Sequence, residues 1–334
     1  MTSIVSYNIL AGGYSLRENG ARRVKQLTTI IRSADPDIVG IIEATHPGIN
    51  QRPLVVEEIA EELGMQLTMG AETTNDFRLA LLTRLPIVYS KLHPHPGLRK
   101  PLLEVGVEEA NGQVLTVFVT HLTAAFNRGR GGGHIRQREA KAIIEIMEPL
   151  RQQGKPHVLM GDFNSLAPGD SFKASNLLRY IVQMDTQRND SALFDGNPQL
   201  NSVVPPQLRF LNPLLRAIPR SKVLTNLFDA AATFYAPRAS IRLIREVGYV
   251  DCYRQAHPGE EGFTCPAAAP AGRIDYIFAS PDVASRLEDC YEIVEGDGMP
   301  GNHASDHLAV AASLGLGVQR DMLVEEACGT AVTS

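Results

Sequence analysis

The sequence predicts an α/β fold with a mixed sheet, and three patterns support this. Helical and strand periodicities alternate through the first third of the chain. Short apolar runs of the buried-strand type recur as far as residue 314. Asn111-Gly112 stands between two strand candidates, and it indicates a hairpin because both residues tolerate positive φ. A hairpin requires antiparallel pairing, which disfavours a purely parallel, doubly wound sheet.

The first elements follow from local periodicity. Residues 3–10 alternate loosely and are rich in β-branched side chains, which predicts a strand. Residues 20–33 place apolar side chains on one face at helical spacing. Asp35-Pro36 ends that helix, because a residue before proline avoids helical geometry. Residues 37–44 are a short apolar run, typical of a buried strand.

The middle of the chain predicts a helix followed by several strands. The helix covers about 53–63, and Gly64 can cap it in the left-handed conformation. Residues 78–83, 102–109 and 114–121 are strand candidates, of which the last two flank the Asn-Gly turn.

A long helix and a buried strand come next. Residues 135–154 carry one apolar stripe and end at Gly154, and residues 157–162 are a buried strand. The pattern blurs over about 172–246, which contains six prolines. We expect this segment to be an insertion, because strand patterns of the same kind resume after it.

Residues 273–280 and 307–314 are predicted to be the last two strands. Residues 316–334 show no convincing pattern and are interpreted as a C-terminal tail. The sequence therefore predicts a single domain over residues 1–315, with the insertion inside it.

Composition excludes some classes of protein. The chain has 334 residues and a net charge of −5, which argues against a protein that coats DNA. It has no apolar run long enough to span a membrane and no N-terminal signal sequence, so we expect a cytoplasmic protein. The four cysteines show no C-x-x-C pairing and are expected to be small buried hydrophobes.

The charge is unevenly distributed along the chain. Residues 172–245 contain ten basic and four acidic side chains, a local net charge of +6, which leaves −11 for the remainder. Such a segment suits an anionic substrate or partner. A solvated surface with scattered arginines is an equally good interpretation.

Polar side chains stand beside strand after strand. Each alone has a simple explanation, such as an Asx turn, a surface acid or a structural histidine. Their recurrence is harder to explain, because sites are assembled where strands end at the edge of a sheet. The residues concerned are Asn8, Glu43, His121, Asp162, Asn164, Asp275, Asp306 and His307.

The donor types restrict the chemistry. Carboxylate and amide oxygens suit Mg²⁺ or Mn²⁺ better than zinc. A calcium EF-hand is excluded for residues 162–170, because Ala167 stands where the loop needs glycine. A metal held by carboxylates, a histidine near an acid and a water-orienting amide together describe metal-assisted hydrolysis of a phosphate ester.

Six motifs resemble those of a known superfamily in order and approximate spacing. They are "SYNIL" (6–10), "IIEA" (41–44), "THL" (120–122), "GDFNS" (161–165), "RIDYIFAS" (273–280) and "SDH" (305–307). The chain resembles the endonuclease/exonuclease/phosphatase superfamily over about residues 4–314. That superfamily includes deoxyribonuclease I, exonuclease III-type enzymes, sphingomyelinases, inositol polyphosphate phosphatases and poly(A) deadenylases.

The resemblance implies a fold and a metal site. The fold is a four-layer α/β sandwich, in which two mixed, mostly antiparallel sheets pack face to face with helices outside. Glu43 would be the principal ligand of Mg²⁺ or Mn²⁺, helped by Asn8 and Asp306.

The resemblance also implies catalytic roles. Asp162 would orient or deprotonate the attacking water, and Asn164 would hold the phosphate or the water. His307 would act as a general base or stabilise charge at the scissile phosphate, oriented by Asp275. His121 would bind or protonate phosphoryl oxygens.

Departures from the family pattern leave the subfamily open. Leu10 stands where exonuclease III-type enzymes usually have an acid, and Ile42 stands where a glutamine often precedes the glutamate. The chain has no tryptophan, which limits stacking on nucleobases. The glycine-rich segment 127–134 contains two arginines and is either a cationic lid over a phosphate or a plain connection.

The sequence thus favours a divalent-metal-dependent phosphodiesterase, with a small or lipid-derived phosphodiester as substrate. The alternative within the enzyme class is a nuclease that acts on single-stranded RNA or DNA. A non-catalytic binding module that retains the fold ranks lower, because Glu43, Asp162 and His307 are all present. The pattern indicates no oligomeric state.

Overall fold

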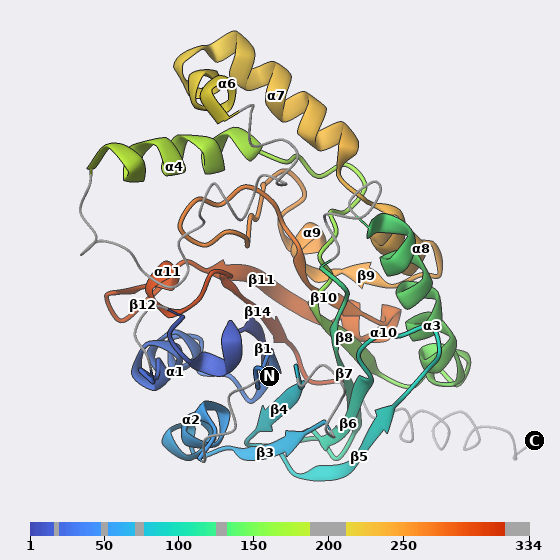
Figure 1. The fold of residues 1–334 in the computed structure, drawn as a ribbon. Coiled ribbons are helices and arrows are strands. Elements are labelled where there is room, and N and C mark those ends of the chain that lie inside the picture. The colour runs from blue at the N-terminus through green and yellow to red at the C-terminus, as the bar shows by residue number, and fades with distance from the viewer. Residues whose placement is uncertain (17–19, 48–52, 71–76, 125–131, 188–211, 318–334) are drawn as a thin grey trace, which may run out of the picture.

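Two six-stranded sheets packed face to face form the centre of the computed structural model (Figure 1). The structure describes residues 1–16, 20–47, 53–70, 77–124, 132–187 and 212–317. The first sheet has the order β11-β14-β1-β2-β4-β3, and only β1 and β2 are parallel. Its strands are β1 (Thr2–Asn8), β2 (Ile38–Ile42), β3 (Gln66–Met69), β4 (Ala80–Thr83), β11 (Leu287–Ile293) and β14 (Ala309–Leu314).

The second sheet has the order β5-β6-β7-β8-β10-β9, and only β7 and β8 are parallel. Its strands are β5 (Ile87–His93), β6 (Leu102–Glu108), β7 (Val114–His121), β8 (His157–Asp162), β9 (Val250–Asp251) and β10 (Asp275–Ala279). The predicted hairpin joins β6 and β7. Gly112 takes the positive φ of 79° that its turn needs, and its N–H donates to the Glu109 carbonyl.

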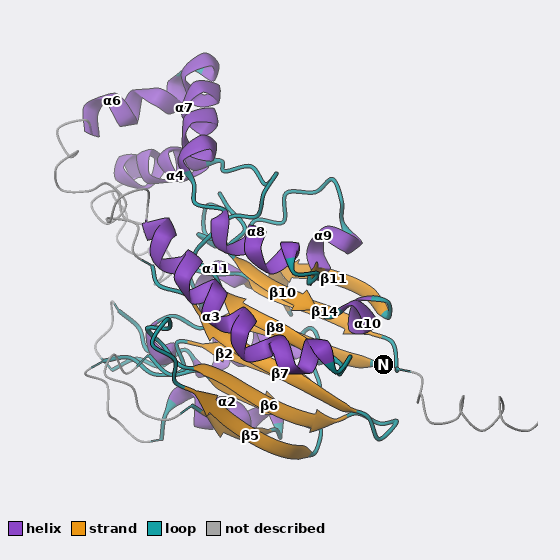
Figure 2. Ribbon diagram, turned by 90° about the vertical axis from the view of Figure 1, so that its right-hand side faces the viewer, coloured by secondary structure: helices purple, strands orange, loops and turns teal. Residues whose placement is uncertain are grey.

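Helices cover the outer face of each sheet, which confirms the four-layer sandwich. α1 (Val24–Arg32) and α2 (Val55–Leu63) lie on the first sheet, and Gly64 caps α2 with a left-handed φ of 65°. α3 (Gly133–Gln152) and α8 (Ala239–Glu246) lie together on the second sheet (Figure 2).

The alternation of side chains along the strands explains how the layers pack together. Val158 and Met160 of β8 face the space between the sheets, whereas Leu159 faces α3 and α8. Ile4 and Val5 of β1 divide in the same way between the inter-sheet core and the layer of α1 and α2. Because both faces of these central strands are covered, they form continuous apolar runs in the sequence.

Two predictions about strands were incomplete or wrong. β3, β5 and β11 were not predicted, because edge strands carry exposed polar side chains and lack an apolar run. The prediction that 273–280 and 307–314 are consecutive strands was wrong. β11, β12 (Glu295–Gly296) and β13 (Met299–Pro300) lie between them, and β12 and β13 pair with each other.

The described part of the 172–246 segment is helical. α4 (Ala174–Gln187), α6 (Asn212–Ala217), the short 3-10 helix η5 (Ile218–Arg220) and α7 (Lys222–Tyr235) surround a small apolar cluster of their own. α4, α6 and α7 project beyond the sandwich in Figures 1 and 2. α8 instead packs on α3 and belongs to the outer layer.

Four short elements complete the described chain: η1 (Ala11–Gly13), α9 (Cys252–Ala256), α10 (Pro281–Ala284) and α11 (Gly301–Ala304). None of the described helices is long and apolar enough to cross a membrane. Residues 127–131 of the glycine-rich segment and residues 318–334 of the tail lie outside the described residues.

Candidate functional site

Strand register in the second sheet brings three of the predicted site residues into one row. His121 ends β7 and is the register partner of Asp162, which ends the parallel strand β8. Asp275 begins β10 and is the antiparallel register partner of the same Asp162. All three residues are buried. The ends of β7 and β8 and the start of β10 therefore meet at one edge of this sheet.

Asp162 and Asn164 are held together by an Asx turn. The Asn164 N–H donates to Asp162 Oδ1 at 2.8 Å, and Asn164 Nδ2 donates to Asp162 Oδ2 at 3.1 Å and to the Leu122 carbonyl at 3.0 Å. Asn164 has a left-handed φ of 48°, so β8 does not continue through it. With both amide hydrogens engaged, Asn164 positions Asp162. Phe163 between them packs in the core against Tyr276 and Phe278.

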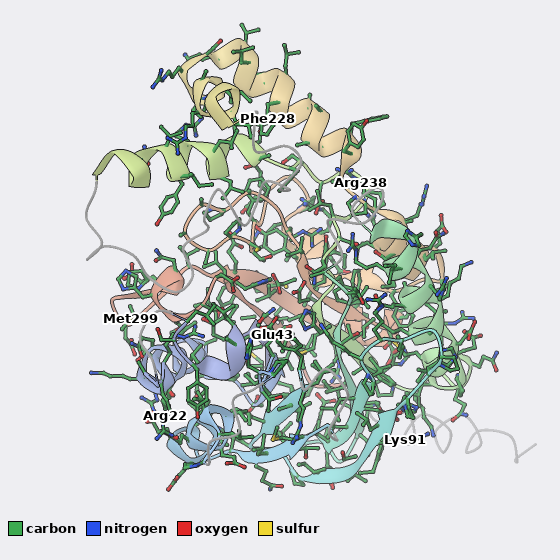
Figure 3. The ribbon with its side chains drawn as sticks, in the orientation of Figure 1. Arg22, Glu43, Lys91, Phe228, Arg238 and Met299 are labelled. Atoms are coloured by element: carbon green, nitrogen blue, oxygen red, sulfur yellow. The ribbon has the colours of Figure 1, made fainter. Side chains whose placement is uncertain are left out.

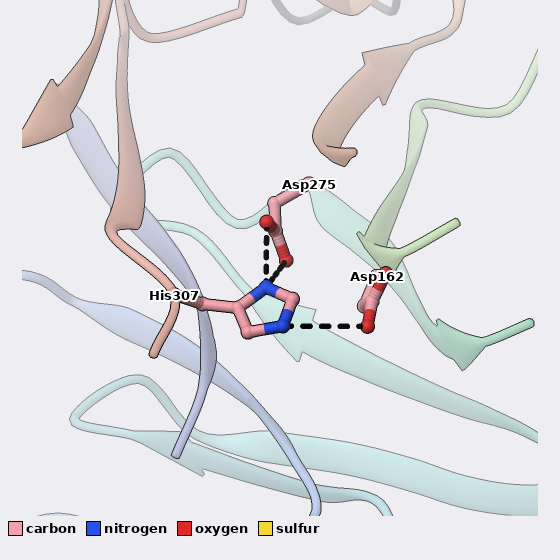
Figure 4. Close-up of side chains that lie close together, drawn as sticks. All are labelled: Asp162, Asp275 and His307. Atoms are coloured by element: carbon pink, nitrogen blue, oxygen red, sulfur yellow. Dashed lines mark hydrogen bonds and ion pairs between the residues drawn. The ribbon is translucent and has the colours of Figure 1, made fainter. Parts of the chain in front are cut away.

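His307 lies between two buried carboxylates (Figure 4). Its Nδ1 is 2.9 and 3.1 Å from the two carboxylate oxygens of Asp275, and its Nε2 is 3.9 Å from Asp162 Oδ2. Burial alone would lower the pKa of His307, but Asp275, Cys265, Asp306 and Asp162 raise it well above the ordinary value. This raised pKa favours the imidazolium form of His307, and Asp275 fixes the ring.

The pKa of Asp162 differs from that of an exposed carboxyl group. Burial raises the pKa of Asp162 to about 7, aided by Asp275 and opposed by the charge of His307. A carboxylate with this pKa can hold or release a proton near neutral pH.

The first sheet contributes Asn8 at the end of β1 and Glu43 directly after β2. Asn8 Nδ2 donates to Asp162 Oδ2 at 3.2 Å, which links the two sheets. Glu43 Oε2 accepts the Ala11 N–H at 3.0 Å, and Glu43 Oε1 lies 3.9 Å from His121 Nε2. Glu43 has a left-handed φ of 58°, a strained conformation typical of functional sites, and it lies near the centre of the molecule in Figure 3.

Asp306 is half-buried and precedes His307 in the loop before β14. Ser305 Oγ donates to the Asn8 carbonyl at 2.7 Å, which ties this loop to the end of β1. Burial raises the pKa of Asp306, and the negative charge of Glu43 raises it further. Glu43 and Asp306 therefore repel each other across this part of the site.

His121 is held as a neutral imidazole. Burial lowers its pKa well below the ordinary value, and the charges of Lys100 and His307 lower it further. Its Nε2 lies 3.5 Å from Asp162 Oδ2, whereas its Nδ1 is buried and has no hydrogen-bond partner among the residues that the structure describes.

The donor set fits a hard divalent cation. Asn8 and Glu43 stand at the ends of the neighbouring parallel strands β1 and β2, and the loop of Asp306 is tied to Asn8, so the oxygens of these three residues can contribute to one site. The negative charge of Glu43 raises the pKa of Asp306. A second grouping is closer in space: ligand atoms of Asp162, Asp275 and His307 all lie within 4.8 Å of one another. Within it, however, Asp275 already accepts from His307 Nδ1.

Sequence reasoning missed Lys100. This half-buried residue precedes β6, and its ammonium lies 5.6 Å from the centre of the Phe77 ring. Burial lowers the pKa of Lys100 to about 8, and Asp162, Glu43 and Glu139 oppose that shift, which places the cation beside the site. β6 is antiparallel to β7, so it starts at the edge where β7 ends. Its only sequence signal was its place two residues before a predicted strand.

Two further residues support the site. Arg23 is buried and donates to the carbonyls of Ile9, Leu10, Tyr14 and Ala304, so it fixes the loop after Asn8 against the segment before Asp306. Burial raises the pKa of the Cys265 thiol to about 11, and the charge of His307 opposes that rise. The prediction that the cysteines are small buried hydrophobes holds for Cys252 and Cys290, but it was wrong for Cys265, which is only half-buried. Cys328 lies outside the described residues.

A sequence model of the Endonuclease/Exonuclease/phosphatase family matches residues 5–307. No curated protein matches the chain significantly.

Solved structures match over nearly the whole chain at low identity, which establishes the likeness of fold. An AP endonuclease from Archaeoglobus fulgidus has a TM-score of 0.57 and 16% identity, and the alignment covers 95% of this chain and 100% of the other. The 3′ phosphatase NExo from Neisseria, bound to a product DNA hairpin, has a TM-score of 0.58, 16% identity and coverages of 95% and 100%. TDP2 from C. elegans has a TM-score of 0.54, 13% identity and coverages of 94% and 75%.

Proposed function

Because the chain belongs to the endonuclease/exonuclease/phosphatase family of hydrolases that act on phosphate esters, we propose that it cleaves a phosphodiester with the help of Mg²⁺ or Mn²⁺. The observation that carries the proposal is the row His121–Asp162–Asp275 with His307 placed between the two acids. This row combines a carboxylate whose pKa is near 7, an imidazolium and a neutral imidazole beside the oxygen donors of the first sheet.

In this proposal each residue of the site has a distinct role. Asp162, with its pKa of about 7, orients the attacking water and accepts its proton. Asn164 and Asn8 hold the Asp162 carboxylate by hydrogen bonds. The His307 imidazolium stabilises negative charge on the phosphoryl oxygens, and Asp275 fixes its ring. The charge-stabilising role of His307 is thus favoured over that of a general base.

Glu43, Asn8 and Asp306 are the residues that would hold the cation. When bound, a divalent cation neutralises phosphoryl charge and lowers the pKa of water. We prefer these ligands to the Asp162–Asp275–His307 group because Asp275 is already engaged with His307. A cation held by these residues would relieve the mutual repulsion of Glu43 and Asp306. His121, with Nε2 toward Asp162 and Glu43, is placed to contact a phosphoryl oxygen.

The substrate that we favour is a small or lipid-derived phosphodiester. The net charge of −5 opposes long duplex DNA, and the absence of tryptophan limits stacking on bases. The alternative is a nuclease on single-stranded RNA or DNA. It is supported by the local charge of +6 over residues 172–245 and by the DNA-hairpin complex of the similar Neisseria enzyme.

A substrate panel tests the proposal. Initial rates would be measured with Mn²⁺ on a soluble activated phosphodiester, the matching monoester, a choline phospholipid, a cyclic or dinucleotide diester and a single-stranded oligonucleotide. We expect hydrolysis of diesters over the monoester, lost in His307→Ala. Preference for the oligonucleotide, with steep salt dependence, would favour the nuclease. No turnover of any member would leave only the binding module.

A further inference from the structure

The helix α7 presents an apolar stripe to solvent. Val223, Leu227 and Phe234 are 67%, 63% and 85% exposed, and they follow one another at helical spacing. The exposed residues Ala230 and Ala231 continue the stripe between Leu227 and Phe234. A surface helix usually turns charged or polar residues outward. This exposed stripe therefore indicates a contact surface for a second apolar surface, such as that of a protein or a membrane.

The opposite face of α7 is already occupied. Phe228 packs on the small cluster formed with α4 and η5, and it lies between α7 and α4 in Figure 3. Thr225 Oγ1 donates to the Ile218 carbonyl, and Asp229 accepts from the N–H and the hydroxyl of Ser175. The outer stripe is therefore additional to the face that holds the helix in place.

The charges around the stripe are positive. Residues 212–245 contain six basic side chains and one acidic one, Asp229, which is engaged with Ser175. Arg220, the last residue of η5, and Lys222, the first residue of α7, are exposed, and Arg242 is exposed beyond the other end of α7. An apolar row flanked by cations at both ends is complementary to an apolar surface that carries anionic groups.

A hollow of about 480 Å³ adjoins the C-terminal end of the stripe. Phe234 and Tyr235 form one side of it, and His134, Gln137, Arg238 and Arg242 contribute polar groups. Its volume is within the range of small-ligand sites. The combination of aromatic and cationic walls suits an anionic group attached to an apolar body.

The hollow is close to the candidate active site along the chain and in space. The Leu166 N–H donates to the carbonyl of Pro237, a lining residue, and Leu166 follows Asn164 by two positions. Arg136, in the first turns of α3, donates to Ser165 Oγ at 2.9 Å. The hollow and the row His121–Asp162–Asp275 are thus connected through only a few residues.

We propose that the outer face of α7 and the adjoining hollow dock the protein onto an anionic lipid bilayer, with α7 lying in the interfacial plane. This inference rests on the proposed function, because it names a lipid surface as the place where phosphodiester substrate is met. The same few residues that link the hollow to Asn164 would bring the site to headgroup phosphates.

Two features favour a bilayer over single-stranded nucleic acid. Binding of single strands uses aromatic platforms interleaved with basic residues along the groove. On α7 the row is aliphatic from Val223 to Ala231, and the cations lie only at its two ends. Aliphatic side chains gain free energy from insertion between acyl chains, whereas they lack the aromatic face on which a base stacks.

The test is cosedimentation of the full chain with vesicles. One set contains phosphatidylcholine alone and the other equal parts of phosphatidylcholine and phosphatidylserine. We expect binding to the anionic vesicles, weakened by salt. The double variant Leu227→Ser/Phe234→Ser should bind at least about tenfold more weakly. The double variant Arg220→Ser/Lys222→Ser should lose most of the preference for phosphatidylserine.

Matched controls remove exposed groups elsewhere. Val88→Ser/Val294→Ser removes two apolar side chains that are 52% and 59% exposed, and Lys91→Ser removes an exposed cation of β5. These variants should bind vesicles like the wild type. Equal loss in test and control variants, or no binding of the wild type to anionic vesicles, would overturn the proposal. So would self-association or oligonucleotide binding that the α7 variants abolish while vesicle binding stays.

Hydrolysis of a soluble diester separates this inference from the proposed function. Leu227→Ser and Arg220→Ser/Lys222→Ser should hydrolyse bis(p-nitrophenyl) phosphate at the wild-type rate, because these side chains lie outside both the hollow and the candidate site. Vesicle binding without any diester hydrolysis would keep the docking surface and overturn the proposed function. Diester hydrolysis without vesicle binding would keep the proposed function and overturn the docking surface.

Discussion

Asp275 holds His307 through both of its carboxylate oxygens, which lie 3.1 and 2.9 Å from His307 Nδ1. The pair joins the start of β10 in one sheet to the loop before β14 in the other. The arrangement fixes the ring and keeps it charged, and the second nitrogen is left facing Asp162. The chemistry proposed here depends on this orientation.

Replacement of Asp275 should slow turnover without unfolding the protein. Asp275→Asn keeps the shape but removes the negative charge that raises the pKa of His307. We expect kcat to fall about 10- to 100-fold, and His307→Ala to lower it about 100- to 10,000-fold. Steady-state kinetics on a soluble diester measures both, and the double variant should be no slower than His307→Ala. Additive losses would show that the two residues act separately.

Gly161 controls the placement of Asp162. A Cβ at this position would lie 1.9 Å from the Thr120 carbonyl oxygen, and the backbone has φ +148°. Gly161→Ala should therefore destabilise the fold by about 3 kcal/mol or more, and it should displace Asp162 from its place beside His121 and Asp275. Urea unfolding gives the free energy.

Gly169→Ala is the matched control for this change. Gly169 also has a positive φ, +93°, but no atom of the described residues lies within 4 Å of the place that a Cβ would take. Its cost should be only the backbone strain of about 1 kcal/mol. A Gly161 variant as stable as the Gly169 variant would contradict the close packing of β7 on β8.

Lys100 should contribute to the binding of anionic substrate. Its charge lies beside Glu43 and Asp162 at the edge where the strands meet. Lys100→Ala should raise KM about tenfold, with a smaller effect on kcat, whereas Lys100→Arg should keep most of the affinity. Lys91→Ala removes an exposed cation of β5 and serves as the control. A similar rise in KM for both alanine variants would point to overall surface charge instead.

His157 makes stability depend on pH. Burial lowers its pKa below 6.5, and the ring is held between the Lys155 carbonyl and the Tyr249 hydroxyl. The unfolded chain then binds a proton more readily than the folded one, so stability is complete above the unfolded pKa and is lost as pH falls through the folded pKa.

The measurement compares wild type and His157→Gln by denaturant unfolding at about pH 7.5 and about pH 5.5. The wild type should lose more stability on acidification than the variant, by up to about 1 kcal/mol. Equal losses in the two proteins would show that other groups account for the acid sensitivity. His157 lies at the start of β8, away from Asp162 at its end, so catalysis does not confuse this readout.

The central strands and the main helices could be predicted from sequence because burial on both faces leaves continuous apolar runs. β1, β2, β7 and β8 are of this kind. β5 and β11 lie at sheet edges, and their exposed polar residues resemble those of loops. Which strands are neighbours is set by long-range packing, which local periodicity does not encode.

The site could be predicted in part for the same reason. Polar residues at the ends of β1, β7 and β8 were conspicuous in apolar surroundings, and the motifs supplied the others. Asp162 and Asn164 stand two positions apart, as residues on one face of a strand do, but the strand ends at Asp162 and an Asx turn makes their contact. Lys100 was missed because a residue before an antiparallel strand reaches the site only once β6 has paired with β7.

The most direct test of the central claim is the rate of bis(p-nitrophenyl) phosphate hydrolysis by metal-stripped protein as Mn²⁺ is added. The account predicts no turnover after chelation and saturable recovery with Mn²⁺. Glu43→Gln removes the negative charge that raises the pKa of Asp306. This variant should need an Mn²⁺ concentration at least about tenfold higher to recover half of its maximal rate. Turnover by the stripped protein, or a Mn²⁺ requirement unchanged in Glu43→Gln, would contradict the account.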